Sequence, residues 1–102
     1  MIKIVIKTDE SSKKITSIEV SGHSGKDVYG KDLVCAAVST IMTGGMNALK
    51  DKNYDFLLKE GHAYVKCRKL PGEHDTVVLE TMQIQLQTVE EADPEFIKIE
   101  IL

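Results

Sequence analysis

The chain has 102 residues, of which 42% are hydrophobic and 28% are charged, and its formal net charge is −3. This length predicts a single domain over residues 1–102 with one hydrophobic core. Segment 73–93 carries six acidic residues and neither Lys nor Arg. Direct binding to nucleic acid is therefore not expected, because phosphate contacts require a basic surface.

The sequence also argues against a membrane or secreted protein. It has no apolar run near the ~20 residues that a membrane-spanning helix needs, and its first residues alternate instead of forming the core of a signal peptide. Two cysteines, Cys35 and Cys67, in such a chain are typical of free thiols in a reducing compartment. We therefore expect a cytoplasmic protein that has no disulfide and does not contact a membrane.

The first half of the chain predicts a β-hairpin followed by a helix. Strands are expected at 1–7 and 15–21, where apolar residues alternate with polar ones. A polar loop over 24–31 leads into a helix from about Asp32 to Lys50, with Asp32 as its N-cap. The pair Gly44-Gly45 costs about 1 kcal/mol per glycine relative to alanine. We expect this pair to allow a strand or a second subunit to approach the helix backbone closely.

The second half predicts the order strand, strand, helix, strand. Strands at 54–59 and 62–68 are joined by a tight turn at Glu60-Gly61, a helix runs from Glu73 or Asp75 to about Glu91, and a strand covers 96–102. The fold class is therefore α+β: a two-layer sandwich with a mixed, mostly antiparallel five-stranded sheet and two helices in the order ββαββαβ.

Cys35 allows two interpretations. A free cysteine in an alanine-rich helix is most often a small core residue. However, if Asp32 caps the helix, Cys35 lies in the first helical turn, where free backbone N–H groups and the helix dipole favour a thiolate. Its own helix face carries Ser39, Met42 and Met46, separate from the apolar stripe, so this face could line a groove or contact a partner subunit.

His23 is the residue best placed to act with Cys35. By strand alternation it lies on the polar side of strand 15–21, just past Gly22, and loop 24–31 is long enough to bring its imidazole to the thiol. Such a pair could form an activated nucleophile, although Cys–His coincidences are common in short chains. A metal site fits less well, because the Cys and His residues lack the short spacings of structural zinc sites. Cys67 is expected in the core.

The segment SGHSGKDVYGKDLVCAAVS, residues 21–39, resembles the ribosomal-processing cysteine proteases, the Prp family of bacteria. The resemblance rests on Gly22-His23, on Tyr29 to Asp32 and on Val34 to Ser39. It implies a homodimer with an α+β fold, and we expect neither a cofactor nor a metal. It further implies an endopeptidase that removes a short N-terminal extension from protein twenty-seven of the large ribosomal subunit.

The resemblance also implies roles for individual residues. His23 is the base and Cys35 the nucleophile of a His/Cys dyad, while Gly22, Asp32 and Ser39 support the site. Gly25, Tyr29 and Gly30 belong to a substrate loop whose glycines allow it to move. Backbone N–H groups at the start of the helix, including that of Cys35, are expected to hold the oxyanion. The alternatives are a ribosome-associated binding module without chemistry, and a thiol redox or acyl-transfer enzyme that uses the same cysteine.

Overall fold

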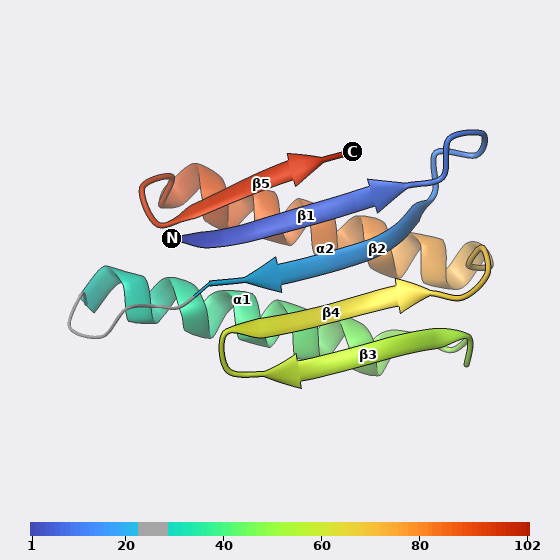
Figure 1. Cartoon of the computed structure of the whole chain (residues 1–102), viewed down its shortest axis with the longest axis horizontal. Coiled ribbons are helices and arrows are strands. Elements are labelled where there is room, and N and C mark those ends of the chain that lie inside the picture. Colours follow the sequence, from blue (N-terminus) through green and yellow to red (C-terminus); the bar gives the residue numbers. More distant parts are fainter. Residues whose placement is uncertain (23–28) are drawn as a thin grey trace.

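The computed structural model describes residues 1–22 and 29–102, with only the backbone for 29–32. The elements follow the predicted order ββαββαβ (Figure 1). They are β1 (Ile2–Thr8), β2 (Ile15–Ser21), α1 (Tyr29–Ala48), β3 (Tyr54–Lys59), β4 (His62–Cys67), α2 (Glu73–Ala92) and β5 (Ile97–Ile101).

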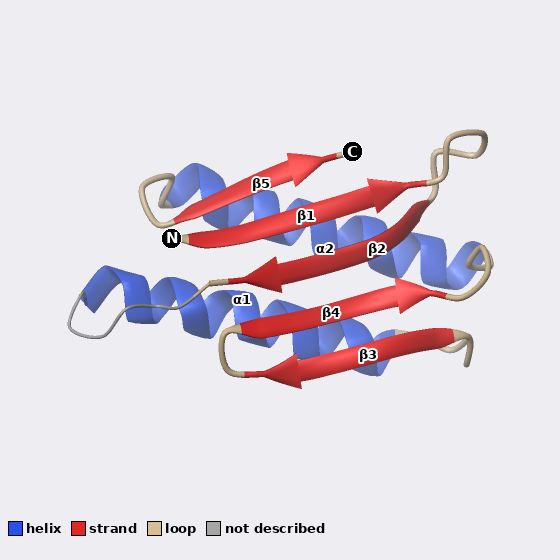
Figure 2. Cartoon of the chain, in the orientation of Figure 1, coloured by secondary structure: helices blue, strands red, loops and turns tan. Residues whose placement is uncertain are grey.

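The five strands form one sheet in the order β3-β4-β2-β1-β5. The pairs β1–β2, β2–β4 and β3–β4 are antiparallel, and only β1–β5 is parallel. Both helices lie on the same face of this sheet (Figure 2). The predicted two-layer α+β sandwich with a mixed, mostly antiparallel sheet is therefore confirmed.

The core lies between the sheet and the two helices. Every second residue of β1 points into it, and fully buried side chains of this kind each contribute roughly 1.5–3 kcal/mol. The most buried members are Ile4, Ile6, Ile18, Met42, Val65, Leu79, Met82, Leu86 and Ile97. The opposite face of the sheet carries polar and charged residues such as Lys3, Glu19 and Lys66, as expected for a face without a covering layer.

The edge strand β3 is not fully covered by the helices. Phe56 and Leu58 pair with the buried Val65 and Ala63 of β4, so they point to the helix side of the sheet, yet they remain 50% and 52% exposed. This incomplete cover leaves open space between β3 and α1.

Gly22 ends β2 in a conformation that favours glycine. Its φ is +111°, and a Cβ atom at this position would overlap the carbonyl oxygen of Met1. Its N–H donates a hydrogen bond to the carbonyl of Gly61 at 3.1 Å. Gly22 therefore joins three segments: the end of β2, the start of β1 and the β3–β4 turn.

The start of α1 differs from the prediction. The helix begins at Tyr29, three residues before Asp32, so Asp32 is not the N-cap. Tyr29 and Gly30, which were assigned to the substrate loop, belong to the first helical turn. Gly25 of that loop lies outside the described residues. The apolar pattern on which the prediction relied could not reveal this extra turn, because that pattern starts at Val34.

Of the two roles expected for the Cys35 face of α1, contact with a partner subunit does not suit its two methionines, although Met42 does line a groove beside Cys35. Met42 is fully buried in the core, and Met46 packs against it. The expected close approach to the glycine pair is made at Gly45 by α2: a Cβ at Gly45 would overlap the side chain of Met82. Gly44 faces open space.

These two adjacent glycines therefore make a matched pair of substitutions. Gly44→Ala should raise the free energy of unfolding by about 0.5–1 kcal/mol, because alanine is the better helix former and its methyl group meets nothing. Gly45→Ala should lower it despite the same helix preference, because Met82 is itself buried and has little room to move. Urea unfolding of both variants would check this, and equal effects would contradict the packing described here.

A buried carboxylate connects the end of α1 to the start of α2. Asp75 is 1% exposed and accepts hydrogen bonds from the backbone N–H groups of Lys50 (2.9 Å) and Asp51 (2.8 Å), from the Tyr54 hydroxyl (2.6 Å) and from Nδ1 of His74 (2.8 Å). Burial alone would raise the pKa of Asp75, but these hydrogen bonds hold it well below its ordinary value of 3.8.

Candidate active site

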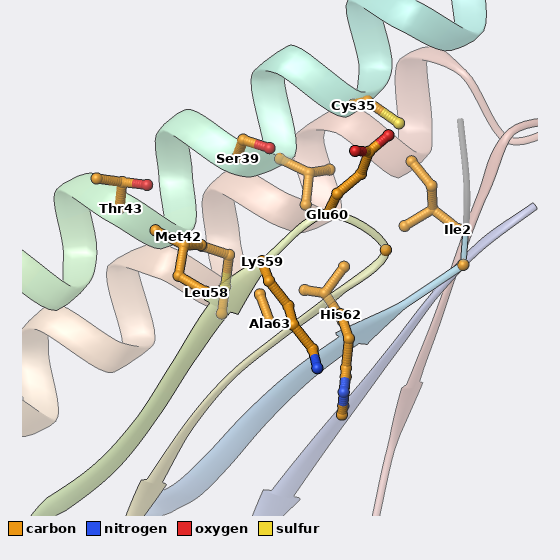
Figure 3. A pocket seen from close by; sticks show the side chains of 14 residues that line it. Ile2, Cys35, Ser39, Met42, Thr43, Leu58, Lys59, Glu60, His62 and Ala63 are labelled. Atoms are coloured by element: carbon orange, nitrogen blue, oxygen red, sulfur yellow. The ribbon is translucent and has the colours of Figure 1, made fainter. Parts of the chain in front are cut away.

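A groove of about 460 Å³ lies between α1 and the end of the β3–β4 hairpin. Its apolar lining comes from Ile2, Val20, Val38, Met42, Leu58 and Ala63, and the remaining lining residues are Gly22, Cys35, Ser39, Thr43, Lys59, Glu60, Gly61 and His62 (Figure 3). The groove occupies the space that β3 leaves uncovered. An extended peptide could lie in it along α1.

Cys35 lines this groove and is partly buried. It is the seventh residue of α1 and thus lies in the second helical turn, not in the first. The argument from the helix N-terminus is therefore weaker than the sequence suggested, since the dipole effect falls off within the first turn. The N–H at the seventh position is normally bonded to the carbonyl four residues earlier, so the backbone N–H of Cys35 does not suit an oxyanion.

The structure brings together some of the predicted site residues. Ser39 is exposed one helical turn after Cys35 and lines the same groove, as does Gly22. His23 directly follows Gly22 but lies outside the described residues. The side chains of Tyr29 and Asp32 are likewise not described, so their predicted roles stay predictions.

The β3–β4 turn is the part of the site that the sequence analysis missed. Glu60-Gly61 was identified only as a hairpin turn. Because β4 pairs with β2, His62 lies opposite Ser21, and the turn comes next to Gly22. No local pattern indicates this pairing, although the Gly22–Gly61 hydrogen bond shows how tightly the two segments are joined.

Cys67 lies outside the groove. It packs against the core, as predicted, and its Sγ is 4.0 Å from the carbonyl oxygen of Ile15. Burial, with a smaller contribution from the negative charge of Asp75, raises the pKa of the Cys67 thiol to about 11. Cys67 is therefore a neutral thiol near pH 7.

The two cysteines should differ in their rates of alkylation. Iodoacetamide near neutral pH is expected to modify Cys35, which lines the groove, much faster than Cys67, because only a thiolate reacts and the thiolate of Cys67 is disfavoured. Peptide mapping by mass spectrometry at timed intervals would measure both rates. Preferential labelling of Cys67 in the folded protein would contradict this assignment.

The described side chains form no metal-binding cluster: within residues 1–22 and 33–102, no three His, Cys, Asp or Glu side chains are grouped so that they could hold a metal ion. None of the described helices is both long and apolar enough to cross a membrane.

Comparison with known proteins decides the family. The sequence profile described as cysteine protease Prp matches residues 1–98. The chain belongs to this family. It is 31% identical to the ribosomal processing cysteine protease Prp of Staphylococcus aureus over 97% of both proteins. This Prp-family chain is therefore a cysteine protease, and hence a hydrolase.

Solved structures agree with this fold over the whole chain. The S. aureus ribosomal processing protease Prp in complex with a substrate peptide has a TM-score of 0.90 at 27% identity, with all of both chains covered. The same S. aureus protease with a covalently linked product peptide has a TM-score of 0.87 at 29% identity, again with full coverage. A Streptococcus mutans protein, covered over 94% of its length, has a TM-score of 0.87 at 26% identity.

Proposed function

We propose that this protein is an endopeptidase that removes the short N-terminal extension of protein twenty-seven of the large ribosomal subunit, with Cys35 as nucleophile and His23 as base. One observation carries the proposal: of the two cysteines in the chain, Cys35 alone lines the groove. The position of Gly22 in the same lining supports the choice of His23, which follows it in the chain. The S. aureus relative with a covalently linked product peptide supports cysteine chemistry at such a site.

The proposed reaction proceeds in two steps. His23 takes the proton from the Cys35 thiol, Sγ attacks the scissile carbonyl carbon, and the imidazolium returns the proton to the leaving amine. A water molecule then attacks the thioester, with His23 as general base, and releases the carboxyl product and the thiol. The free N–H groups of α1 belong to its first four residues, so we assign oxyanion binding to the backbone of 29–32 instead of to Cys35.

The groove suits an extended peptide substrate. Its apolar lining can accept side chains of the peptide, while Ser39 and Thr43 offer exposed hydroxyl groups on successive turns of α1. We assign Ser39 and Gly22 to support of the substrate and of the site backbone, respectively. The enzyme is further proposed to act in the cytoplasm on this ribosomal protein, without direct contact to nucleic acid.

We also propose that the protein forms a homodimer. Because Met42 is buried, the argument rests on α2 and not on the methionines of α1. The exposed side of α2 carries Val77 and Ile84, which are 56% and 62% exposed. Contact with a second copy would remove these apolar side chains from water. Analytical ultracentrifugation at micromolar concentration would check this, and a monomer there would refute it.

The proposed activity is tested by incubating the enzyme with the ribosomal protein that carries its extension. Intact-mass spectrometry should show loss of a short N-terminal peptide and formation of one shortened product. An unchanged mass under conditions in which the enzyme is folded would refute the proposal, and several cleavage positions would refute a specific processing role.

A further inference from the structure

Glu60 lies in the groove opposite the proposed nucleophile. It occupies the turn between β3 and β4, is exposed, and lines the same groove as Cys35. Figure 3 shows its side chain rising from the turn toward the Cys35 end of α1. A peptide bound between α1 and the turn would therefore pass this carboxylate close to the bond that is cut.

The side chains of Lys59 and His62, which also line the groove, point elsewhere. Lys59 and His62 pair with each other across the hairpin. Lys59 follows Leu58 and His62 precedes Ala63, and both of these neighbours face the helix side of the sheet. The side chains of Lys59 and His62 therefore belong to the open face of the sheet, as Figure 3 also shows. Nε2 of His62 is held there by Glu19 at 2.6 Å.

Glu60 is not neutralised by its described neighbours. Ion pairs involve Glu19, Asp55 and Asp75 in the described part of the chain, and Glu60 has neither an ion pair nor a side-chain hydrogen bond there. The turn itself is stabilised by Gly61, whose φ is +82°. The carboxylate of Glu60 is therefore available for a ligand and is not needed for the fold.

We propose that Glu60 is a specificity-determining residue that selects a peptide with a positively charged side chain next to the scissile bond. The inference rests on the proposed function, since it takes Cys35 to mark the position of that bond. A carboxylate at the edge of a cleft with partly apolar walls attracts a cation and repels an acidic side chain. Because the groove is open to water, we expect a preference on the order of two- to fivefold for lysine over an uncharged side chain of similar length.

The test uses pairs of peptides that span the extension junction of the ribosomal protein. Each of the three residues on either side of the scissile bond is replaced in turn by lysine or by norleucine, which has a similar length without the charge. The ratio of kcat/KM for the two peptides is measured with the wild-type enzyme, Glu60→Gln and Glu60→Lys. Glu80→Gln, at an exposed position of α2 outside the groove lining, is the matched control.

At one or more positions, the wild type and Glu80→Gln should prefer lysine about two- to fivefold. Glu60→Gln should reduce this ratio to about one, and Glu60→Lys should reverse it. The preference should also shrink as the salt concentration rises, because exposed charges are screened. An equal ratio in the wild type and in Glu60→Gln at every position would overturn the inference.

A second measurement separates this inference from the proposed activity. Binding of the same peptide pairs to a Cys35→Ser variant, followed by fluorescence anisotropy, reports charge selection without cleavage. If the wild type cuts no peptide but Glu60→Gln still removes the charge preference in binding to the Cys35→Ser protein, the proposed activity fails while charge selection by Glu60 stands. If binding shows no dependence on the peptide charge, the inference fails whether or not cleavage occurs.

Discussion

Cys35→Ala is expected to reduce cleavage of the extended ribosomal protein by a factor on the order of a thousand or more, while the protein remains folded. Without a nucleophile, the enzyme keeps only its contacts for positioning and for the oxyanion. The fold should tolerate the change because alanine is the best helix former and Cys35 is only partly buried in the groove wall. Single-turnover cleavage assays, with circular dichroism to confirm the fold, would measure both effects.

Two further variants complete this experiment. His23→Ala should lose a comparable factor, and the double variant should lose little more, because the two residues act as one unit. Cys67→Ser is the matched control: a hydroxyl group placed against the core should lower stability modestly and leave cleavage largely intact. Cleavage by Cys35→Ala, or a folded but inactive Cys67→Ser, would show that the nucleophile has been assigned to the wrong cysteine.

Asp75→Ala should have the largest effect on stability, about 3 kcal/mol or more of the free energy of unfolding. Its carboxylate accepts four hydrogen bonds, and its removal leaves the buried Tyr54 hydroxyl and two backbone N–H groups without their acceptor. Urea unfolding at pH 7 would measure the loss. Glu73→Ala, at an exposed position in the same helical turn, is the control and should change stability by less than about 0.5 kcal/mol.

The effect of Asp75→Ala should depend on pH. The pKa of Asp75 is lower in the folded protein than its ordinary value of 3.8, so ionisation of this group stabilises the fold. This contribution is complete well above pH 3.8 and decreases as the pH falls toward the folded-state pKa. The stability difference between wild type and Asp75→Ala should therefore shrink between pH 5 and pH 2. A constant difference would mean that Asp75 stabilises the fold by packing alone.

Most secondary structure followed from local patterns in the sequence. The strand β2 lies where alternation predicted it, β3 has its predicted bounds, and Gly61 marked the hairpin correctly. The errors arose where tertiary contacts decide. Met42 was expected on a face separate from the apolar stripe, yet α1 packs against both the sheet and its neighbour α2, so it is buried on more than one side. A helical wheel drawn for a single apolar stripe cannot show this second buried side.

The candidate site was only half predictable. Cys35 and His23 stood out because nucleophile and base residues appear in a distinctive motif, whereas Glu60 carried no signal of its own. It reaches the groove through the pairing of β4 with β2, a long-range contact that depends on how the hydrophobic faces of two hairpins meet. Sequence patterns describe each hairpin but not the register between them.

The parallel pairing of β1 with β5 has a consequence for biosynthesis. β1 is made before β5, and the two are joined over their length from Ile2–Ile97 to Ile6–Ile101. Until β5 has left the ribosome, β1 has an unpaired edge, and the core lacks the buried Ile97. Such a contact between segments far apart in the sequence slows folding. The domain should therefore become fully folded only after β5 has left the ribosome, and nascent chains that lack β5 should be open to aggregation and degradation.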